Sequence, residues 1–232
     1  MKVGIMQPYF FPYIGYFQLI HAVDLFVVYD NIKYTKKGWI NRNRMLQNGK
    51  GVKFSLPLKN DLDSLNVCER QLAADFNRDK LLNKFKGAYL GAPYFAQTFP
   101  LVEDIVRYEE ANLFHFLHYS IAKTCEHLGI RTEIRVSSDI AIDHGLKNQD
   151  KVLALCESIG ASVYVNAIGG MVLYSKEAFL DKGISLKFIK SRPFDYTQFG
   201  NDFVPWLSII DVMMFNSVAA IKECLSHSYE LI

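Results

Sequence analysis

The chain has 232 residues, of which 50% are hydrophobic, 14% aromatic and 22% charged, a composition that suits one large folded domain and excludes general disorder. Lysine and arginine number 26 against 24 acidic residues, so the charge balance gives no support to a nucleic-acid partner. No apolar run approaches the roughly 20 residues needed to cross a bilayer, and the start of the sequence lacks the features of a signal peptide. We therefore expect a cytoplasmic protein with no membrane span.

The first elements follow a strand–helix–strand order. Residues 2–6 predict a short buried strand, residues 15–22 a helix and residues 24–30 a second strand. This spacing is typical of parallel strands joined by a right-handed crossover. The segments that follow are expected to be a strand at 52–58 and mostly helical structure at 79–87 and 102–129.

The last third of the chain returns to alternating strands and helices. The expected strands are 132–140, 161–167 and 184–189, and the expected helices are 150–159, 175–181 and 207–225. We predict a single α/β domain over residues 1–232, with an open, mostly parallel, Rossmann-like sheet. Placing all the strands in this one sheet makes residues 76–130 an inserted helical layer.

Ligands of an open parallel sheet bind at the carboxyl ends of its strands. This rule selects four segments: residues 7–16, 30–44, 139–148 and 166–174. Each segment is richer in polar residues and glycine than its flanks. We expect the four segments to meet along one edge of the sheet and to form one pocket there.

The first segment begins with Gln7, which offers an amide donor and an acceptor where the first strand ends. Gly15 allows a close approach of backbone or ligand, and the helix start after it presents free N–H groups to an anion. Tyr13 and Tyr16 are candidate ligand contacts. The alternative is that both tyrosines are core aromatics.

The second segment is basic and rich in amides, with aromatic residues interleaved. Its arginines suit phosphate or carboxylate groups, and its tryptophan suits stacking on a base or sugar. The alternative is a solvated basic strand, whose alternation puts the two asparagines on one face and the two arginines on the other. The candidate binding residues are Tyr34, Trp39, Asn41, Arg42, Asn43 and Arg44.

Two residues are candidates for a general base. Asp30 ends the second strand, and His144 follows the strand expected at 132–140. The four cysteines form no C-x-x-C pair and the histidines form no H-E-x-x-H pattern, so we predict no metal site.

The remaining candidates lie late in the chain. The loop after residues 161–167 can form a backbone nest for an anion, although an ordinary loop is the alternative. Ser208 and Asp211 stand at the start of the last helix, where they either face the cleft or stabilise the helix end. The candidates in the loop are Asn166, Gly169, Gly170 and Tyr174.

Several spaced signatures together resemble the WbqC-like family over essentially the whole chain. They are Met6-Gln7-Pro8, Pro12, Gly15-Tyr16, Ala22, Asp24, Trp39, Asn41-Arg42-Asn43-Arg44, Gly169-Gly170, Tyr174 and Leu207-Ser208-Ile209-Ile210-Asp211. The resemblance implies an enzyme of O-antigen (lipopolysaccharide) or other bacterial surface-polysaccharide biosynthesis. It implies transfer of an acyl or aminoacyl group, such as glycyl, to the amine of a nucleotide-linked amino sugar. An activated acyl or aminoacyl donor would be the co-substrate, and Gln7, Asp30 and His144 are then the predicted catalytic residues.

A more distant resemblance links Tyr13-Ile14-Gly15-Tyr16 to the (H/T)-x-G-H signature of the nucleotidyltransferase superfamily, which implies a nucleotidyltransferase-like sheet. Both signature positions are tyrosine here, and tyrosine supplies no positive charge to a phosphoryl transition state. Two alternatives to acyl transfer therefore stay open: an ATP-dependent nucleotidyltransferase or ligase, and a non-catalytic protein that binds sugar nucleotides. The sequence also leaves open whether the chain forms a homo-oligomer.

Overall fold

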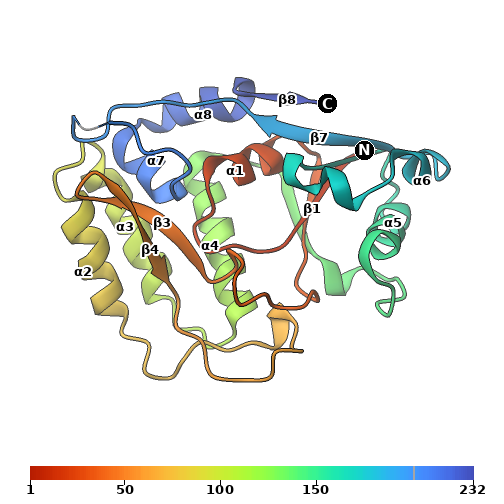
Figure 1. The fold of residues 1–232 in the computed structure, drawn as a ribbon, viewed down its shortest axis with the longest axis horizontal. Coiled ribbons are helices and arrows are strands. Elements are labelled where there is room, and N and C mark those ends of the chain that lie inside the picture. The colour runs from red at the N-terminus through yellow and green to blue at the C-terminus, as the bar shows by residue number, and fades with distance from the viewer. Residues whose placement is uncertain (201) are drawn as a thin grey trace.

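The computed structural model describes residues 1–200 and 202–232, and its centre is a six-stranded sheet in the order β5-β2-β1-β6-β7-β8 (Figure 1). Neighbouring strands run parallel, except that β8 is antiparallel to β7. The predicted α/β class with a mostly parallel, Rossmann-like sheet is confirmed. The strands are β1 (Lys2–Met6), β2 (Leu25–Val28), β5 (Glu133–Val136), β6 (Val163–Ala167), β7 (Ser185–Ser191) and β8 (Tyr229–Leu231).

Both faces of the central strands are apolar, as expected for buried parallel strands. In β1 and β2, Val3, Ile5 and Val27 belong to one hydrophobic cluster, whereas Phe26 and Val28 belong to another. The first cluster is completed by α5 (Asn148–Ser158) and α6 (Lys176–Leu180), and the second by α1 (Ile14–His21), α4 (Leu113–Leu128) and α8 (Val218–His227). The sheet therefore lies between two layers of helices.

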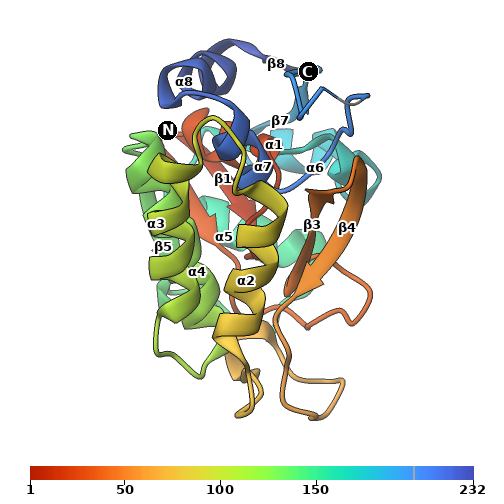
Figure 2. The same cartoon turned by 90° about the vertical axis from the view of Figure 1, so that its left-hand side faces the viewer.

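The prediction that all strands join one sheet is wrong. The strands β3 (Arg42–Gln47) and β4 (Lys50–Ser55) form a separate antiparallel hairpin, which lies beside α2 (Arg78–Tyr89) away from the main sheet (Figure 2). Asn48 and Gly49 close the hairpin with φ angles of 52° and 68°. An Asn-Gly pair with positive φ at both positions favours a tight two-residue turn, so the chain folds back on itself here.

Two predicted helices are each divided in the structure. Residues 95–128 form α3 (Phe95–Arg107) and α4, and residues 209–227 form α7 (Ile209–Phe215) and α8. The new starts are capped: the Asn112 side chain accepts a hydrogen bond from His115 N, and the Ser217 side chain accepts one from Ala220 N. Such caps begin a new helix. Among the helices of the described residues, none is long and apolar enough to cross a membrane.

The order of the strands defines where the chain changes direction across the sheet. From β1 the chain passes through α1 to β2 on one side, and from β6 it passes through α6 to β7 on the other side. The neighbouring strands β1 and β6 therefore flank a topological switch point. Open α/β sheets bind their ligands at the carboxyl ends of the strands at this point.

Candidate functional site

A cavity of about 910 Å³ lies at the switch point. Its walls come from the carboxyl ends of β1 and β6, the residues after β2, the first turn of α5 and the 3-10 helix η3 (Ile168–Leu173). The volume is in the range of small-molecule sites, about 300–1,000 Å³. Position and size together make this cavity the candidate functional site.

The lining of the cavity is polar and positively charged. Three lysines line it, Lys33, Lys147 and Lys151, and none of the described lining residues is an aspartate or a glutamate. Such a lining favours an anionic ligand. The polar lining residues also include three tyrosines, Tyr9, Tyr29 and Tyr174, and six amides, Gln7, Asn31, Asn66, Asn148, Gln149 and Asn166.

Asn31 lies between His144 and Ser137, and Ser137 in turn contacts Asp30. His144 Nδ1 lies 2.9 Å from Asn31 Nδ2. On the other side, Ser137 Oγ lies 3.0 Å from Asn31 Oδ1 and 2.7 Å from Asp30 Oδ1, and its single hydrogen is shared between these two acceptors. Asp30 also accepts a hydrogen bond from Ser138 N at 3.0 Å. The Asn31 amide is therefore flanked by His144 and Ser137 from behind the cavity wall.

Neither Asp30 nor His144 lines the cavity, although both were predicted as catalytic. Asp30 is 3% exposed, and its carboxylate is turned toward Ser137 and Ser138. Because an amide nitrogen can only donate, His144 Nδ1 accepts from Asn31, and a neutral ring then carries its hydrogen on Nε2. His144 therefore contacts the Asn31 amide directly, whereas Asp30 contacts Ser137, which lies beside that amide.

Burial changes the proton affinity of two residues in the wall. It lowers the pKa of the Lys151 ammonium, and the positive charge of Lys147 lowers it further, while Asp30 and Cys68 act more weakly in the opposite direction. Burial also raises the pKa of Tyr29 to about 12. The site thus keeps Tyr29 in its neutral form at ordinary pH.

Five of the predicted binding and catalytic residues line the cavity. Gln7 lies at the end of β1, Asn166 in β6, Gly169 and Gly170 in η3, and Tyr174 directly after η3. Asn166 is 6% exposed, and its Oδ1 accepts a hydrogen bond from Ala167 N at 2.7 Å. Burial raises the pKa of Tyr174, and a side-chain hydrogen bond from the Asn166 amide acts to lower it, so one Nδ2 hydrogen remains for a partner in the cavity.

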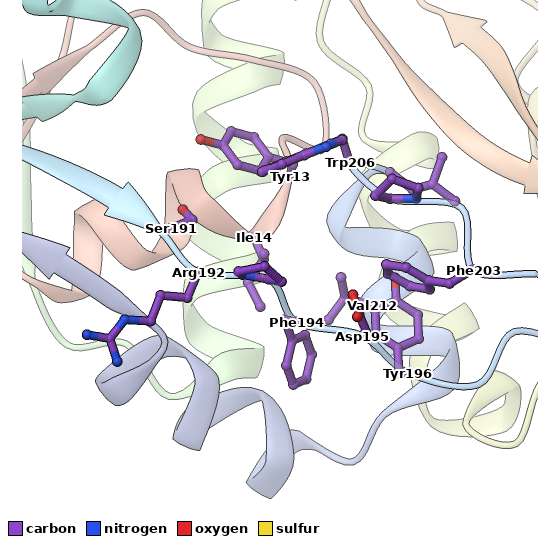
Figure 3. A pocket seen from close by; sticks show the side chains of 13 residues that line it. Tyr13, Ile14, Ser191, Arg192, Phe194, Asp195, Tyr196, Phe203, Trp206 and Val212 are labelled. Carbon is purple, nitrogen blue, oxygen red and sulfur yellow. The ribbon is translucent and has the colours of Figure 1, made fainter.

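The other candidates of the first segment lie elsewhere. Tyr16 is buried and donates a hydrogen bond to Gln7 O at 3.0 Å, so it supports the backbone of the loop. A methyl group at Gly15 would overlap the Tyr13 ring and Ser191 Oγ, so Gly15 allows close packing there. Tyr13 lies in a second, smaller cavity of about 250 Å³, where Figure 3 shows it together with Trp206, across from Phe194.

The basic segment lies outside the main cavity, apart from its first residues. Arg42 donates to Gly38 O at 2.7 Å and to Lys36 O at 2.6 Å. Arg44 donates to the carbonyl oxygens of Pro205 and Trp206, both at 3.1 Å. The alternating pattern of β3 is present, because Asn43 is buried whereas the two arginines are partly exposed. Backbone carbonyls thus occupy the guanidinium groups that we expected to bind phosphate.

The remaining candidates of this segment also have partners within the protein. Tyr34 is buried and donates to Asn41 Oδ1 at 2.8 Å, and Asn41 donates to Leu56 O at 2.8 Å. Trp39 is 46% exposed and lies outside the described cavities. The prediction that all four segments form one pocket is therefore corrected for the second segment. Of residues 30–44, Asn31 to Lys33 line the cavity.

We expect Arg42→Ala to lower the free energy of unfolding by about 1 kcal/mol, because it removes two hydrogen bonds to carbonyl oxygens of a tight loop. Affinity for any ligand of the main cavity should not change. Urea unfolding and calorimetric titration check the two expectations, with the exposed Lys37→Ala as the matched control. A loss of ligand affinity in Arg42→Ala alone would restore the substrate-binding role predicted from the sequence.

Two further candidates, one from the basic segment and one from late in the chain, support the fold. Asn43 Nδ2 and Ser208 Oγ both donate to Phe11 O, each at 2.8 Å. Phe11 has a φ angle of 44°, an uncommon conformation for a bulky residue. These two hydrogen bonds therefore stabilise the strained loop between β1 and α1.

Asp211 is fully buried in α7 and accepts three hydrogen bonds. They come from Tyr89 Oη at 2.9 Å, Tyr196 Oη at 2.7 Å and Gln198 Nε2 at 2.7 Å. Burial raises the pKa of the Asp211 carboxyl, although these hydrogen bonds act to lower it. Asp211 thus connects α7 to α2 through Tyr89 and to the segment after β7 through Tyr196 and Gln198.

Several lining residues were missed by the sequence analysis. Asn31, Lys33 and Lys147 lie inside segments that the strand-end rule selected, so the rule located them without singling them out. Lys151 lies in a helix, where the sequence does not tell a lysine that faces a cavity from one that faces solvent. Among the described residues, no cluster of three or more His, Cys, Asp and Glu side chains is arranged to hold a metal ion.

Fold and site define a Rossmann-like α/β protein with a positively charged ligand cavity at its switch point. The chain belongs to the WbqC-like protein family, whose model matches residues 7–223. It is also similar to the uncharacterized protein Rv1507c of Mycobacterium tuberculosis. The two sequences are 26% identical over an aligned length of 242 residues, gaps included, and the alignment covers 97% of this chain and 98% of the relative.

Proposed function

We propose that the protein transfers an acyl or aminoacyl group, such as glycyl, to the amine of a nucleotide-linked amino sugar in the biosynthesis of O-antigen or a related bacterial surface polysaccharide. The observation that carries this proposal is the cavity at the switch point, with three lysines, six amides and no described acidic residue in its lining. Lysines suit the phosphates of a nucleotide, and amides suit the hydroxyl groups of a sugar. Family membership supports the biological setting.

The charge of the cavity also supports direct attack by the amine. A surrounding with three lysines and no carboxylate in its described lining disfavours the ammonium form of the sugar and favours the neutral, nucleophilic amine. The amine nitrogen forms a bond to the acyl carbon, the bond from that carbon to the donor's leaving group breaks, and the amine proton passes to the leaving group or to solvent. Asn31 and Asn166 would donate hydrogen bonds to the developing oxyanion.

In this scheme Asp30 and His144 act through Asn31 and do not take the amine proton themselves. The contact of His144 with the Asn31 amide, and the Ser137 hydroxyl that lies between Asn31 and Asp30, would hold Asn31 in one orientation. A fixed donor stabilises charge at the reacting centre more than a mobile one does.

The test is a transfer assay with UDP- and dTDP-linked amino sugars and a panel of acyl and aminoacyl donors, followed by mass spectrometry of the sugar nucleotide. We expect a mass gain that corresponds to one acyl group on the amine. The matched control is the same nucleotide linked to a sugar with a hydroxyl group in place of the amine, which should bind without product. If no donor yields product from any amino sugar, acyl transfer is contradicted.

A second candidate function is sugar-nucleotide binding without catalysis. One observation favours this function: the described lining contains no Asp, Glu, His or Cys side chain, the residue types that most often act as a general base or nucleophile. This function predicts calorimetric binding of the sugar nucleotide with no turnover under any donor condition.

The ATP-dependent alternative has less support from the geometry. Of the two signature tyrosines, Tyr16 is buried against Gln7 O, and Tyr13 lies in the smaller cavity. Neither residue lines the main cavity at the switch point. Release of pyrophosphate on addition of ATP, magnesium and an acid would nevertheless establish this alternative.

A further inference from the structure

Lys151 is a buried cation that forms no ion pair with any carboxylate of the described residues. The residue is only 5% exposed, and it lines the cavity. Its Nζ donates a hydrogen bond to Asn31 O at 3.3 Å. Because an ammonium group has three hydrogens, this bond leaves two for other acceptors. Buried charges are normally paired, so the unpaired Lys151 points to an anionic ligand.

The surroundings of Lys151 hold the ammonium at the cavity wall without neutralising it. Its Nζ lies 5.3 Å from the centre of the Tyr29 ring, a cation–π distance. The other close partner is the Asn31 carbonyl, and both residues line the same cavity. Neither a ring nor a carbonyl carries a full negative charge, and the Asp30 carboxylate, which favours the ammonium form, makes no ion pair with Lys151 among the described residues.

The first turn of α5 adds a second source of positive potential. No side chain caps this helix end, where Lys147 is the residue before the first turn. The N–H groups of the turn therefore have no capping partner, and they carry the partial positive charge of a helix N-terminus. Asn148 and Gln149 line the cavity, whereas the acidic Asp150 is exposed and does not.

The backbone at this turn contains one left-handed residue. Asn148 has a φ angle of 49°, a conformation that asparagine adopts more readily than most residues other than glycine. The turn thus brings the helix end, two lysines and the cavity wall together at one place.

We propose that Lys147, Lys151 and the first turn of α5 bind the diphosphate of the sugar nucleotide, so that the sugar lies toward Gln7 and Asn166 at the ends of β1 and β6. The identity of the whole ligand rests on the proposed function, whereas binding of a diphosphate does not. A nucleoside diphosphate and free pyrophosphate share the chemistry that this subsite would recognise.

The experiment is a calorimetric titration of UDP, uridine and pyrophosphate into the wild type, Lys151→Met and Lys147→Glu, with Lys80→Ala on α2 as the matched control. Methionine keeps the apolar stem of Lys151 and removes its charge. We expect the wild type to bind UDP more tightly than uridine, and Lys151→Met to weaken UDP binding about tenfold, or about 1.4 kcal/mol. Uridine binding should stay within twofold. A response to pyrophosphate alone would identify free pyrophosphate as the source.

Lys147→Glu provides an independent arm, because Lys147 is exposed and its replacement should not affect folding. We expect it to weaken UDP binding at least fivefold, and Lys80→Ala to leave it unchanged. UDP affinities within twofold of wild type in both cavity variants, or no binding of any diphosphate, would overturn the subsite. If the two variants weaken UDP binding but no acylated product is found, the diphosphate subsite stands and acyl transfer is contradicted. If acylated product forms and Lys151→Met leaves the KM for the sugar nucleotide unchanged, acyl transfer stands and the subsite is contradicted.

Discussion

Asp211→Ala is expected to lower the free energy of unfolding by about 3–5 kcal/mol. The change leaves the donors on Tyr89, Tyr196 and Gln198 without their shared acceptor, and Tyr89 and Gln198 are fully buried. Each unpaired buried donor costs about 1–3 kcal/mol. Tyr89 Oη also accepts a hydrogen bond from Leu46 N, so the loss extends from α7 through α2 to the β3–β4 hairpin. Urea unfolding followed by circular dichroism measures the effect.

The matched control is Asp195→Ala, since Asp195 directly precedes Tyr196 in the chain but is exposed. It should change the free energy of unfolding by less than about 0.5 kcal/mol. If Asp211→Ala falls within about 1 kcal/mol of wild type, the three hydrogen bonds do not carry the stability assigned to them here.

The pH dependence provides a further check on Asp211. Because burial raises its pKa, the folded protein holds this proton at pH values where the unfolded chain, with an ordinary pKa of about 3.9, has lost it. Between these two pKa values the folded state binds more protons, so the contribution of Asp211 to stability falls as pH rises. Asp211→Asn has no proton to lose, so its unfolding free energy should lack this decline relative to wild type.

The central sheet could be predicted from the sequence because buried parallel strands are short apolar runs between breakers. β1, β2 and β6 have this pattern, whereas β7 mixes apolar and polar residues, and the strand-end rule then located the cavity through Gln7, Asn166 and the glycines of η3. The separate hairpin was not predicted, although Asn48-Gly49 is a recognised turn signal. The helix breaks before α4 and α8 each depend on one N-cap residue, Asn112 or Ser217. The apolar periodicity of these segments continues across the caps, so it does not indicate the breaks.

The candidate site was harder to predict because polar residues that satisfy the backbone look like polar residues that bind a ligand. Asn43 and Ser208 carry the family signature, yet both donate to the carbonyl oxygen of Phe11. Arg42 likewise binds carbonyl oxygens of its own loop. Only the fold shows that Lys151, in an ordinary helical stretch, reaches the cavity. The residues of the family signature thus include ones that stabilise the loop after β1 as well as ones that line the cavity.

The two neighbouring glycines of η3 should respond very differently to the same substitution. A methyl group at Gly170 would lie 2.8 Å from Asn166 Nδ2 and 3.1 Å from its Cγ, whereas a methyl group at Gly169 would meet nothing within 4 Å. Because the contact is with the end of a side chain, the fold should tolerate it, and the Asn166 amide should move instead. We therefore expect Gly170→Ala to affect the reaction and not the stability.

The expected size follows from the role of Asn166 in the cavity. A displacement of a positioned group by about 1 Å can lower a rate about 100-fold, so kcat/KM for acyl transfer should fall about 30- to 100-fold in Gly170→Ala. Gly169→Ala should reduce it less than about threefold, since it adds the same methyl group at the same wall without touching Asn166. Equal losses in the two variants would show that η3, and not the Asn166 amide, limits the reaction. An unchanged rate in Gly170→Ala would remove Asn166 from the chemistry altogether.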